Sequence, residues 1–259
     1  MMIPAEISKR RIVPFAATFA AVYGILRLVP IFVMIGGSGR VFSTTEFVAP
    51  LLGIMLGPYV GSVAAVIGTF LGIMFTGRMN FFGLDFLPSM MNALVLGLMM
   101  RRRPIVAVAL YSALVVLFFA HPSTLHFVSV PFSGNTVSIP FVWLHIIAWV
   151  LLVSPLGMKS VEWISGGSEK KRVAAACLLS LIGTTAQQLT GTLLFASMAV
   201  PLMGMTPNSL GVTWAAVFYT YPIERLAIIL PAATVITAAV VKTVQSARLF
   251  QIPNRAAAE

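Results

Sequence analysis

Charged residues are scarce in this chain of 259 residues, where Asp, Glu, Lys and Arg together make up 9%. A soluble domain of ordinary composition carries roughly 25% charged residues, so the sequence excludes one. Hydrophobic residues amount to 59% and the mean hydropathy is +0.97. The apolar runs reach the roughly 20 residues that cross a bilayer as a helix, and the alternation of a membrane barrel is absent. We therefore predict an all-α polytopic helix bundle in the cell membrane.

Cysteine and histidine are also rare. The one cysteine, Cys177, cannot close a disulfide within the chain, and His121, His126 and His145 do not have the spacing of a metal site. No G-x-x-x-x-G-K-[ST] motif is present, so the chain does not hydrolyse ATP through a phosphate-binding loop. We expect no metal, no cofactor and no enzyme activity of its own.

Basic residues dominate the few charges, since 17 Lys and Arg face 7 Asp and Glu and give a net charge of +10. They are dispersed between apolar segments, which argues against a nucleic-acid-binding face. If the chain starts in the cytoplasm, 13 of the 17 fall on the inner side, with only Arg40 and Arg78 in outer loops. The positive-inside rule therefore predicts that both termini are cytoplasmic.

We predict about eight spans in a single integral membrane domain, residues 1–259. The first span is retained rather than cleaved as a signal peptide, because no small-residue cleavage site follows it. Gly57 and Pro58 predict a tight turn that makes the second and third spans a hairpin. The spans cover residues 12–35, 45–56, 59–75, 84–100, 104–120, 139–155, 173–200 and 222–243.

Several charged side chains fall inside these apolar segments, where each needs a partner or a watery cavity. Arg27 lies toward the outer end of the first span, although snorkelling to the interface is an alternative. Asp85 opens the fourth span, with Ser89 and Asn92 four and seven residues later on the same helix face. This face is predicted to point toward a wet environment.

Other polar positions have local explanations of their own. Glu224 and Arg225 follow Pro222 at the start of the last span, where an outer salt bridge or a helix-dipole interaction is the alternative to a site. Glu46 completes a capping box with Ser43, and we favour helix capping for it. The stripe in the seventh span is explained by interhelical hydrogen bonds; it comprises Thr184, Gln187, Gln188 and Gly191.

The predicted topology nevertheless brings the charged groups to the outer half of the membrane. We expect them to share one pocket open to the outside, in which aromatic rings either form an interfacial belt or stack on a planar ligand. The aromatic residues at this level are Phe81, Phe82, Trp214, Phe218, Tyr219 and Tyr221. The predicted binding residues are Arg27, Asp85, Asn92, Trp214, Tyr219, Glu224 and Arg225.

One weak enzyme signal deserves comparison with this pocket. Residues 36–39 read Gly-Gly-Ser-Gly, which matches the pattern around the nucleophile of rhomboid-type intramembrane proteases, and His145 is the candidate base for Ser38. Glycine and serine are also expected in a flexible loop after the first span. An intramembrane serine protease is therefore an alternative function.

The first hundred residues resemble the substrate-binding S components of energy-coupling factor vitamin transporters. The resemblance lies in residues 20–30 (AAVYGILRLVP), 50–61 (PLLGIMLGPYVG) and 82–88 (FGLDFLP), followed by the basic turn 101–103. It extends to residues 222–225 (PIER). Such proteins have six spans, so we regard 1–103 as the first four spans, 104–157 as an inserted helix pair, and 158–259 as the final two spans and tail.

The resemblance implies a substrate-capture subunit for a vitamin-sized molecule, driven by two cytoplasmic ATPases through a membrane coupling subunit. It implies that residues 36–42 form a lid over the ligand. It also implies docking through alanines four residues apart on the first span, which are Ala16 with Ala20 and Ala17 with Ala21.

In this hypothesis Arg27 and Arg225 neutralise an anionic group of the ligand. Asp85 and Asn92 hydrogen-bond a polar edge of it, and the aromatic residues stack on a ring. An ion-coupled secondary transporter and a purely structural membrane subunit remain as alternatives.

Overall fold

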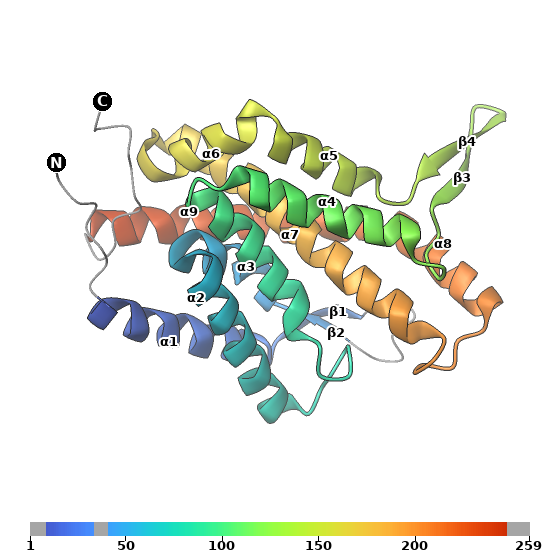
Figure 1. The fold of residues 1–259 in the computed structure, drawn as a ribbon, viewed down its shortest axis with the longest axis horizontal. Helices are drawn as coiled ribbons and strands as arrows, with labels where there is room; N and C mark the ends of the chain where they lie inside the picture. The colour runs from blue at the N-terminus through green and yellow to red at the C-terminus, as the bar shows by residue number, and fades with distance from the viewer. Residues whose placement is uncertain (1–8, 34–40, 248–259) are drawn as a thin grey trace.

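A computed structural model describes residues 9–33 and 41–247, and in it the protein is an all-helical bundle (Figure 1). Two short antiparallel β-hairpins accompany the helices among these residues. The helices are α1 Lys9–Leu26, α2 Thr45–Thr76, α3 Phe86–Met100, α4 Pro104–Ala120, α5 Trp143–Val153, α6 Pro155–Gly166, α7 Glu169–Ala199, α8 Pro207–Ile223, the π-helix η1 Glu224–Ile229 and α9 Leu230–Ser246. The strands are β1 Pro30–Val33, β2 Val41–Ser43, β3 Phe127–Phe132 and β4 Asn135–Pro140.

Three helical stretches in the described part of the chain are long and apolar enough to cross a membrane: Thr45–Thr76, Glu169–Ala199 and Pro207–Ser246. Helices α5 and α6 make a fourth if they count as one span, although they meet at a bend of 72°. These helices are those of a membrane-embedded protein, but the predicted set of eight separate spans is not reproduced. At about 1.5 Å per residue, helices such as α3 and α4 do not reach across a hydrocarbon core of roughly 30 Å.

The predicted turn at Gly57 is present inside α2. Gly57 has φ 77° and ψ −176°, a conformation outside the helical region, and a side chain on Gly61 would overlap the carbonyl oxygen of Leu52. Nine residues of continuous helix would separate these positions by about 13 Å. The two halves of α2 therefore fold back on each other, as the predicted hairpin requires.

Helix α1 is shorter than predicted, because it ends at Leu26 rather than continuing to residue 35. Strand β1 follows and pairs with β2, so that Pro30 lies opposite Ser43. Val29 precedes a proline, and such a residue is biased away from the helical conformation. The hairpin that results returns the chain to the end of α1, where the second half of α2 also packs through Gly68 and Gly72.

The region between α4 and α9 differs most from the prediction. Strands β3 and β4 form a hairpin that projects from the bundle (Figure 1), so the helix expected from residue 139 begins at Trp143. Residues 207–221 were expected in an outer loop and instead form α8, which begins with Pro207 and is capped by the Thr206 hydroxyl accepting from the Ser209 amide at 3.2 Å. Helix α8, η1 and α9 together form one helical stretch, Pro207–Ser246.

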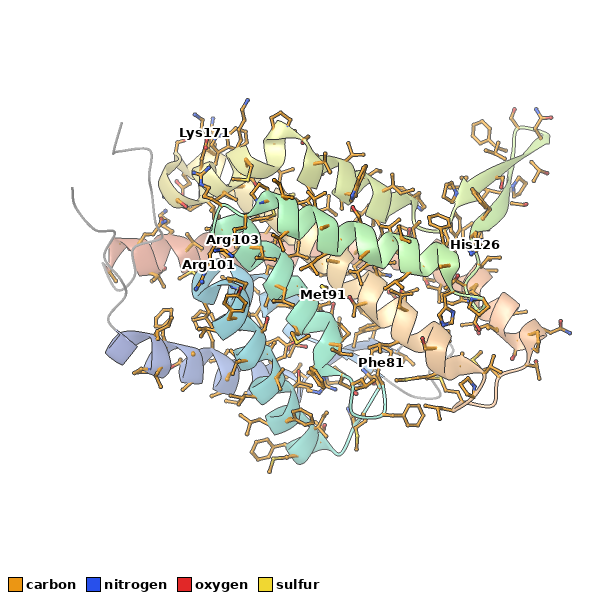
Figure 2. The ribbon with its side chains drawn as sticks, in the orientation of Figure 1. Phe81, Met91, Arg101, Arg103, His126 and Lys171 are labelled. Atoms are coloured by element: carbon orange, nitrogen blue, oxygen red, sulfur yellow. The ribbon has the colours of Figure 1, made fainter. Side chains whose placement is uncertain are left out.

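The segments predicted to face the cytoplasm lie at one end of the bundle. Figure 2 shows Arg101, Arg103 and Lys171 there, and His126 at the opposite end. The turn at Gly57 belongs to the basic end too, because the guanidinium of Arg101 lies 5.5 Å from the ring centroid of Tyr59. Arg248 and Arg255, also predicted inside, lie outside the described residues. The end of α1 and the starts of α2 and α3 therefore point away from the basic end.

Candidate functional site

A hollow lies in the half of the bundle remote from the basic end. Its wall is formed by the last turns of α1, strand β2, the starts of α2 and α3, the middle of α7 and the junction of α8 with η1. The empty volume of the hollow is about 920 Å³, which includes its open mouth. Of the predicted residues, the hollow collects Arg27, Asp85, Trp214, Glu224 and Arg225.

Arg27 and Asp85 form an ion pair at one side of the hollow. The Arg27 Nη2 donates to the Asp85 Oδ1 at 2.6 Å, and the two side chains are 12% and 1% exposed. Asp85 also accepts from the backbone amides of Asn80 at 2.7 Å and Phe81 at 3.0 Å. Gly72 makes room for the arginine, since a methyl group there would overlap its aliphatic stem. Arg27 is therefore paired rather than snorkelling.

A second ion pair joins Arg225 of η1 to Glu46 of α2. The Arg225 Nη1 donates to the Glu46 Oε2 at 2.6 Å, and the two side chains are 2% and 10% exposed. The preference for Glu46 as part of a capping box is wrong. The residue before the helix is Thr44, whose hydroxyl donates to the Leu26 carbonyl at 2.8 Å instead of accepting from a helix amide.

Hydrogen bonds connect the Glu46–Arg225 ion pair to Gln187 in the polar stripe of α7 and then to Asn92 of α3. The Gln187 Nε2 donates to the Glu46 Oε1 at 2.8 Å, and the Asn92 Nδ2 donates to the Gln187 Oε1 at 2.8 Å. Asn92 is fully buried and lies behind the wall of the hollow rather than in it. Gly183 provides the space for its side chain, because a methyl group on Gly183 would overlap the Asn92 Oδ1. The expected interhelical hydrogen bonds are confirmed for Gln187, whereas the Thr184 hydroxyl donates to the Ser180 carbonyl of its own helix.

The aromatic residues divide between two environments. Phe81, Trp214 and Tyr221 line the hollow, and the Trp214 Nε1 is fixed by donating to the Ser123 carbonyl at 2.8 Å. Tyr219 is 51% exposed and lies with Phe218 in a separate apolar groove next to the β3–β4 hairpin. The prediction that Tyr219 contributes to the pocket is wrong, because Tyr219 and Tyr221 lie two positions apart on a helix and therefore point in different directions.

Two polar atoms at the hollow have no hydrogen-bond partner among the described residues. They are the Oε1 of Gln188, an acceptor on α7, and the Nε of Arg225, a donor on η1. Both residues line the hollow. A buried polar group without a partner is costly, and such groups are expected where water or a ligand completes them.

Sequence reasoning missed several residues of the wall. Among them are Tyr23, Asn80 and Phe195, and the hydroxyl of Tyr23 contacts that of Ser89, which was predicted on the same helix face as Asp85. Tyr23 could have been found, because it lies four residues before Arg27 on the same face of α1. Asn80 and Phe195 carry no such signal, since their position depends on how a loop and a distant helix pack.

The alanine pairs of α1 face in different directions. Ala20 is 3% exposed and its carbonyl lies against Gly68 of α2, while Ala16 is partly buried against the core. Ala20 is not available as a docking surface, because the second half of α2 covers it, and Ala16 is only partly accessible. Ala17 and Ala21 are exposed on the next face of the helix.

The proposed protease pair and lid are only partly within the described residues. Ser38 and residues 36–40 of the lid lie outside them, whereas Val41 and Phe42 line the hollow. His145 is fully buried in α5, with its ring centroid 5.5 Å from that of Tyr221. No group of three metal-ligating side chains occurs in residues 9–33 and 41–247.

Chemically, the hollow offers paired charges, aromatic faces and two uncommitted hydrogen-bonding atoms, which suit the binding of a small polar molecule. Comparison of the chain with protein-family models, with curated proteins and with solved structures found no match in any of the three.

Proposed function

We propose that the protein is the membrane substrate-capture subunit of an ATP-driven importer of the energy-coupling factor type. It binds a vitamin-sized molecule from outside the cell and is not an enzyme. A membrane coupling subunit and a pair of cytoplasmic ATPases supply the driving force, so the chain needs no cofactor of its own. Both termini are cytoplasmic in this proposal.

The observation that carries the proposal is the hollow, in which side chains from distant segments converge. Arg27 and Asp85 are 58 residues apart and Glu46 and Arg225 are 179 residues apart, yet both pairs line the same space. Charges buried in a membrane protein are costly, and they commonly mark a substrate pathway or binding site. The hollow opens in the half of the bundle remote from the basic end, as capture from outside requires.

Docking on a coupling subunit is assigned to the exposed side of α1. Ala17 and Ala21 are exposed there four residues apart, and small side chains let another helix approach closely. Ala16 and Ala20 are no longer part of this assignment.

The test is purification of the tagged full-length chain from its native membranes. We expect a second membrane protein and two ATPases to accompany it, and we expect ATP to trigger release of the bound small molecule. The variant Ala17→Leu/Ala21→Leu should lose these partners and keep the small molecule. Isolation of the chain alone, with ligand flux in liposomes driven by an ion gradient, would contradict the proposal.

That contradicting outcome is the signature of the second candidate, an ion-coupled secondary transporter. The buried series Asn92, Gln187, Glu46 and Arg225 favours it, because linked polar groups inside a membrane can serve an ion or proton pathway. The secondary transporter predicts transport without ATP.

A further inference from the structure

The charges that line the hollow do not balance. Arg27 and Arg225 contribute two positive formal charges, whereas Glu46, Asp85 and Glu224 contribute three negative ones. The lining therefore carries a net formal charge of −1. Within the described part of the chain, no other Asp, Glu, Lys or Arg belongs to this lining.

Both arginines are already neutralised by a carboxylate. Each pair has an N–O distance of 2.6 Å, and at most 12% of any of the four side chains is exposed. An anionic ligand would therefore meet arginines whose charge is already balanced by Asp85 or Glu46, and its own charge would be buried beside these carboxylates without a free counter-charge. The observed pairs thus remove the reason for expecting an anionic ligand.

Glu224 is the carboxylate that is left over. It makes no ion pair with a lysine, arginine or histidine of the described residues, whereas the four ion pairs found there involve Asp85, Glu162, Glu46 and Glu169. Glu224 lies next to Arg225 in sequence, but the guanidinium of Arg225 is directed to Glu46. The hollow therefore presents to whatever enters it one carboxylate that has no ion-pair partner among the described residues.

The aromatic lining favours the same ligand charge. Six aromatic rings line the space, and an aromatic π-face attracts a cation; they belong to Tyr23, Phe42, Phe81, Phe195, Trp214 and Tyr221. The Phe42 ring already lies beside the Arg225 guanidinium, which is 5.9 Å from the ring centroid. A separate observation points to a ligand rather than to packing. Arg225 is 2% exposed and its Nε has no partner in the described structure, and the Gln188 Oε1 lacks one as well.

We propose that the hollow binds a small organic cation, either an ammonium compound or a protonated nitrogen heterocycle. Glu224 is its counter-charge, the aromatic rings surround its positive group, and the Gln188 Oε1 accepts a hydrogen bond from an N–H of the ligand. The Arg225 Nε donates to an acceptor elsewhere on the same molecule. This assignment rests on the proposed capture function and specifies its ligand class.

The test compares three probes of equal shape and different charge: benzylamine, benzyl alcohol and benzoate. Binding of each to the purified full-length protein is measured by titration calorimetry or by the shift in the unfolding temperature. We expect benzylamine to bind at least roughly tenfold more tightly than the other two, since a charge-assisted contact is involved. The variant Glu224→Gln should lose this preference, and the control Glu169→Gln, an exposed carboxylate paired with Lys242, should retain it.

Tighter binding of benzoate, equal binding of benzylamine by the wild type and Glu224→Gln, or binding of no probe would overturn the cation assignment. The unfolding temperatures of the wild type and Glu224→Gln are also measured without ligand. Equal values exclude loss of fold as the cause of a lost preference. Benzoate binding would leave the capture function intact. The capture function is tested separately by purification from native membranes. It fails if no coupling partners accompany the chain and ATP does not release the bound molecule.

Discussion

The two carboxylate oxygens of Glu46 bind two different partners, Gln187 and Arg225. One accepts from Gln187 of α7 at 2.8 Å and the other from Arg225 of η1 at 2.6 Å. Because Arg225 is 2% exposed, its charge has little access to water. The carboxylate is therefore needed for the folded state as well as for the shape of the hollow.

Substituting Glu46→Gln should leave the Arg225 guanidinium buried without its partner. We expect the free energy of unfolding to fall by about 3 to 5 kcal/mol, the range found when one member of a buried pair is removed. Reversible unfolding in mixed detergent micelles measures this change. The double variant Glu46→Gln/Arg225→Met should recover most of the loss, whereas equal stability of the single variant and the wild type would contradict the assigned role.

Gly72 controls the other ion pair by being small. A methyl group at Gly72 would overlap the stem of Arg27, so Gly72→Ala should move the guanidinium away from Asp85. We expect a destabilisation of about 1 to 3 kcal/mol from this overpacking, together with weaker ligand retention. Gly211→Ala is the matched control, because Gly211 lies in α8 with open space around it and should be unaffected or slightly stabilised. Equal behaviour of the two variants would be the contrary result.

For single residues, the sequence predicts that a buried charged side chain has a partner. It does not predict equally well which residue that partner is. Arg27 and Asp85 could be placed in one pocket because each was unexplained inside an apolar segment. Glu46 was misinterpreted because the local pattern of a capping box accounts for it without any distant residue. Its real partner, Arg225, lies 179 residues away, and no local pattern contains that information.

Among the elements, the hairpin within α2 depends on one backbone conformation. Gly57 has φ 77° and ψ −176°, a region that is essentially restricted to glycine. The same turn approaches α3, where a side chain on Gly97 would overlap the backbone of Pro58. The position of both helices, and with them Glu46 and Asp85 at their opposite ends, follows from this turn.

Gly57→Ala should therefore lower the free energy of unfolding by about 1 to 3 kcal/mol, the cost of such a strained conformation. Gly77→Asn is the matched comparison. Gly77 has φ 65° and ψ 3°, a left-handed conformation that asparagine tolerates, and a Cβ there meets no atom within 4 Å. Thermal unfolding of the two variants should differ, with Gly57→Ala clearly the less stable, and a reversed order would argue against the hairpin.

Elements with strong local signals were predicted well, and those that depend on packing were not. Helices α3, α4 and α7 follow from apolar runs with clear ends, and the turn at Gly57 follows from a Gly-Pro pair. Helix α8 was expected to be a loop, because the last predicted span begins only at Pro222. Pro207 instead occupies the first turn, where a proline is tolerated. Strand β1 was hidden inside a run long enough to be a span, and β2 falls in the loop that was predicted after it.

The distribution of charge over the whole molecule predicts its orientation in the membrane. Arg101, Arg103 and Lys171 lie at one end of the bundle (Figure 2), and the β3–β4 hairpin projects from the other (Figure 1). The positive-inside rule places the basic end in the cytoplasm. The number of spans was harder to predict from hydropathy. Two helices that join end to end, or that meet at a bend, have the same hydropathy as two separate spans.

Single-cysteine labelling tests this orientation. In a Cys177→Ala background, Asn135→Cys at the β3–β4 turn should react with a membrane-impermeant maleimide in intact cells. Lys171→Cys should react only after the cells are permeabilised. Asn135 and Lys171 are both exposed, so both variants should label fully in detergent. Labelling of Lys171→Cys in intact cells would reverse the assigned topology.

The most direct test of the central claim, that one hollow binds a small molecule, is native mass spectrometry of the purified protein. We predict one retained small molecule per wild-type chain and its loss from Gln188→Leu, which removes an acceptor that has no partner among the described residues. Tyr219→Phe, outside the hollow, should retain it. A wild-type protein without any bound molecule, or retention that is unchanged in Gln188→Leu, would contradict the account.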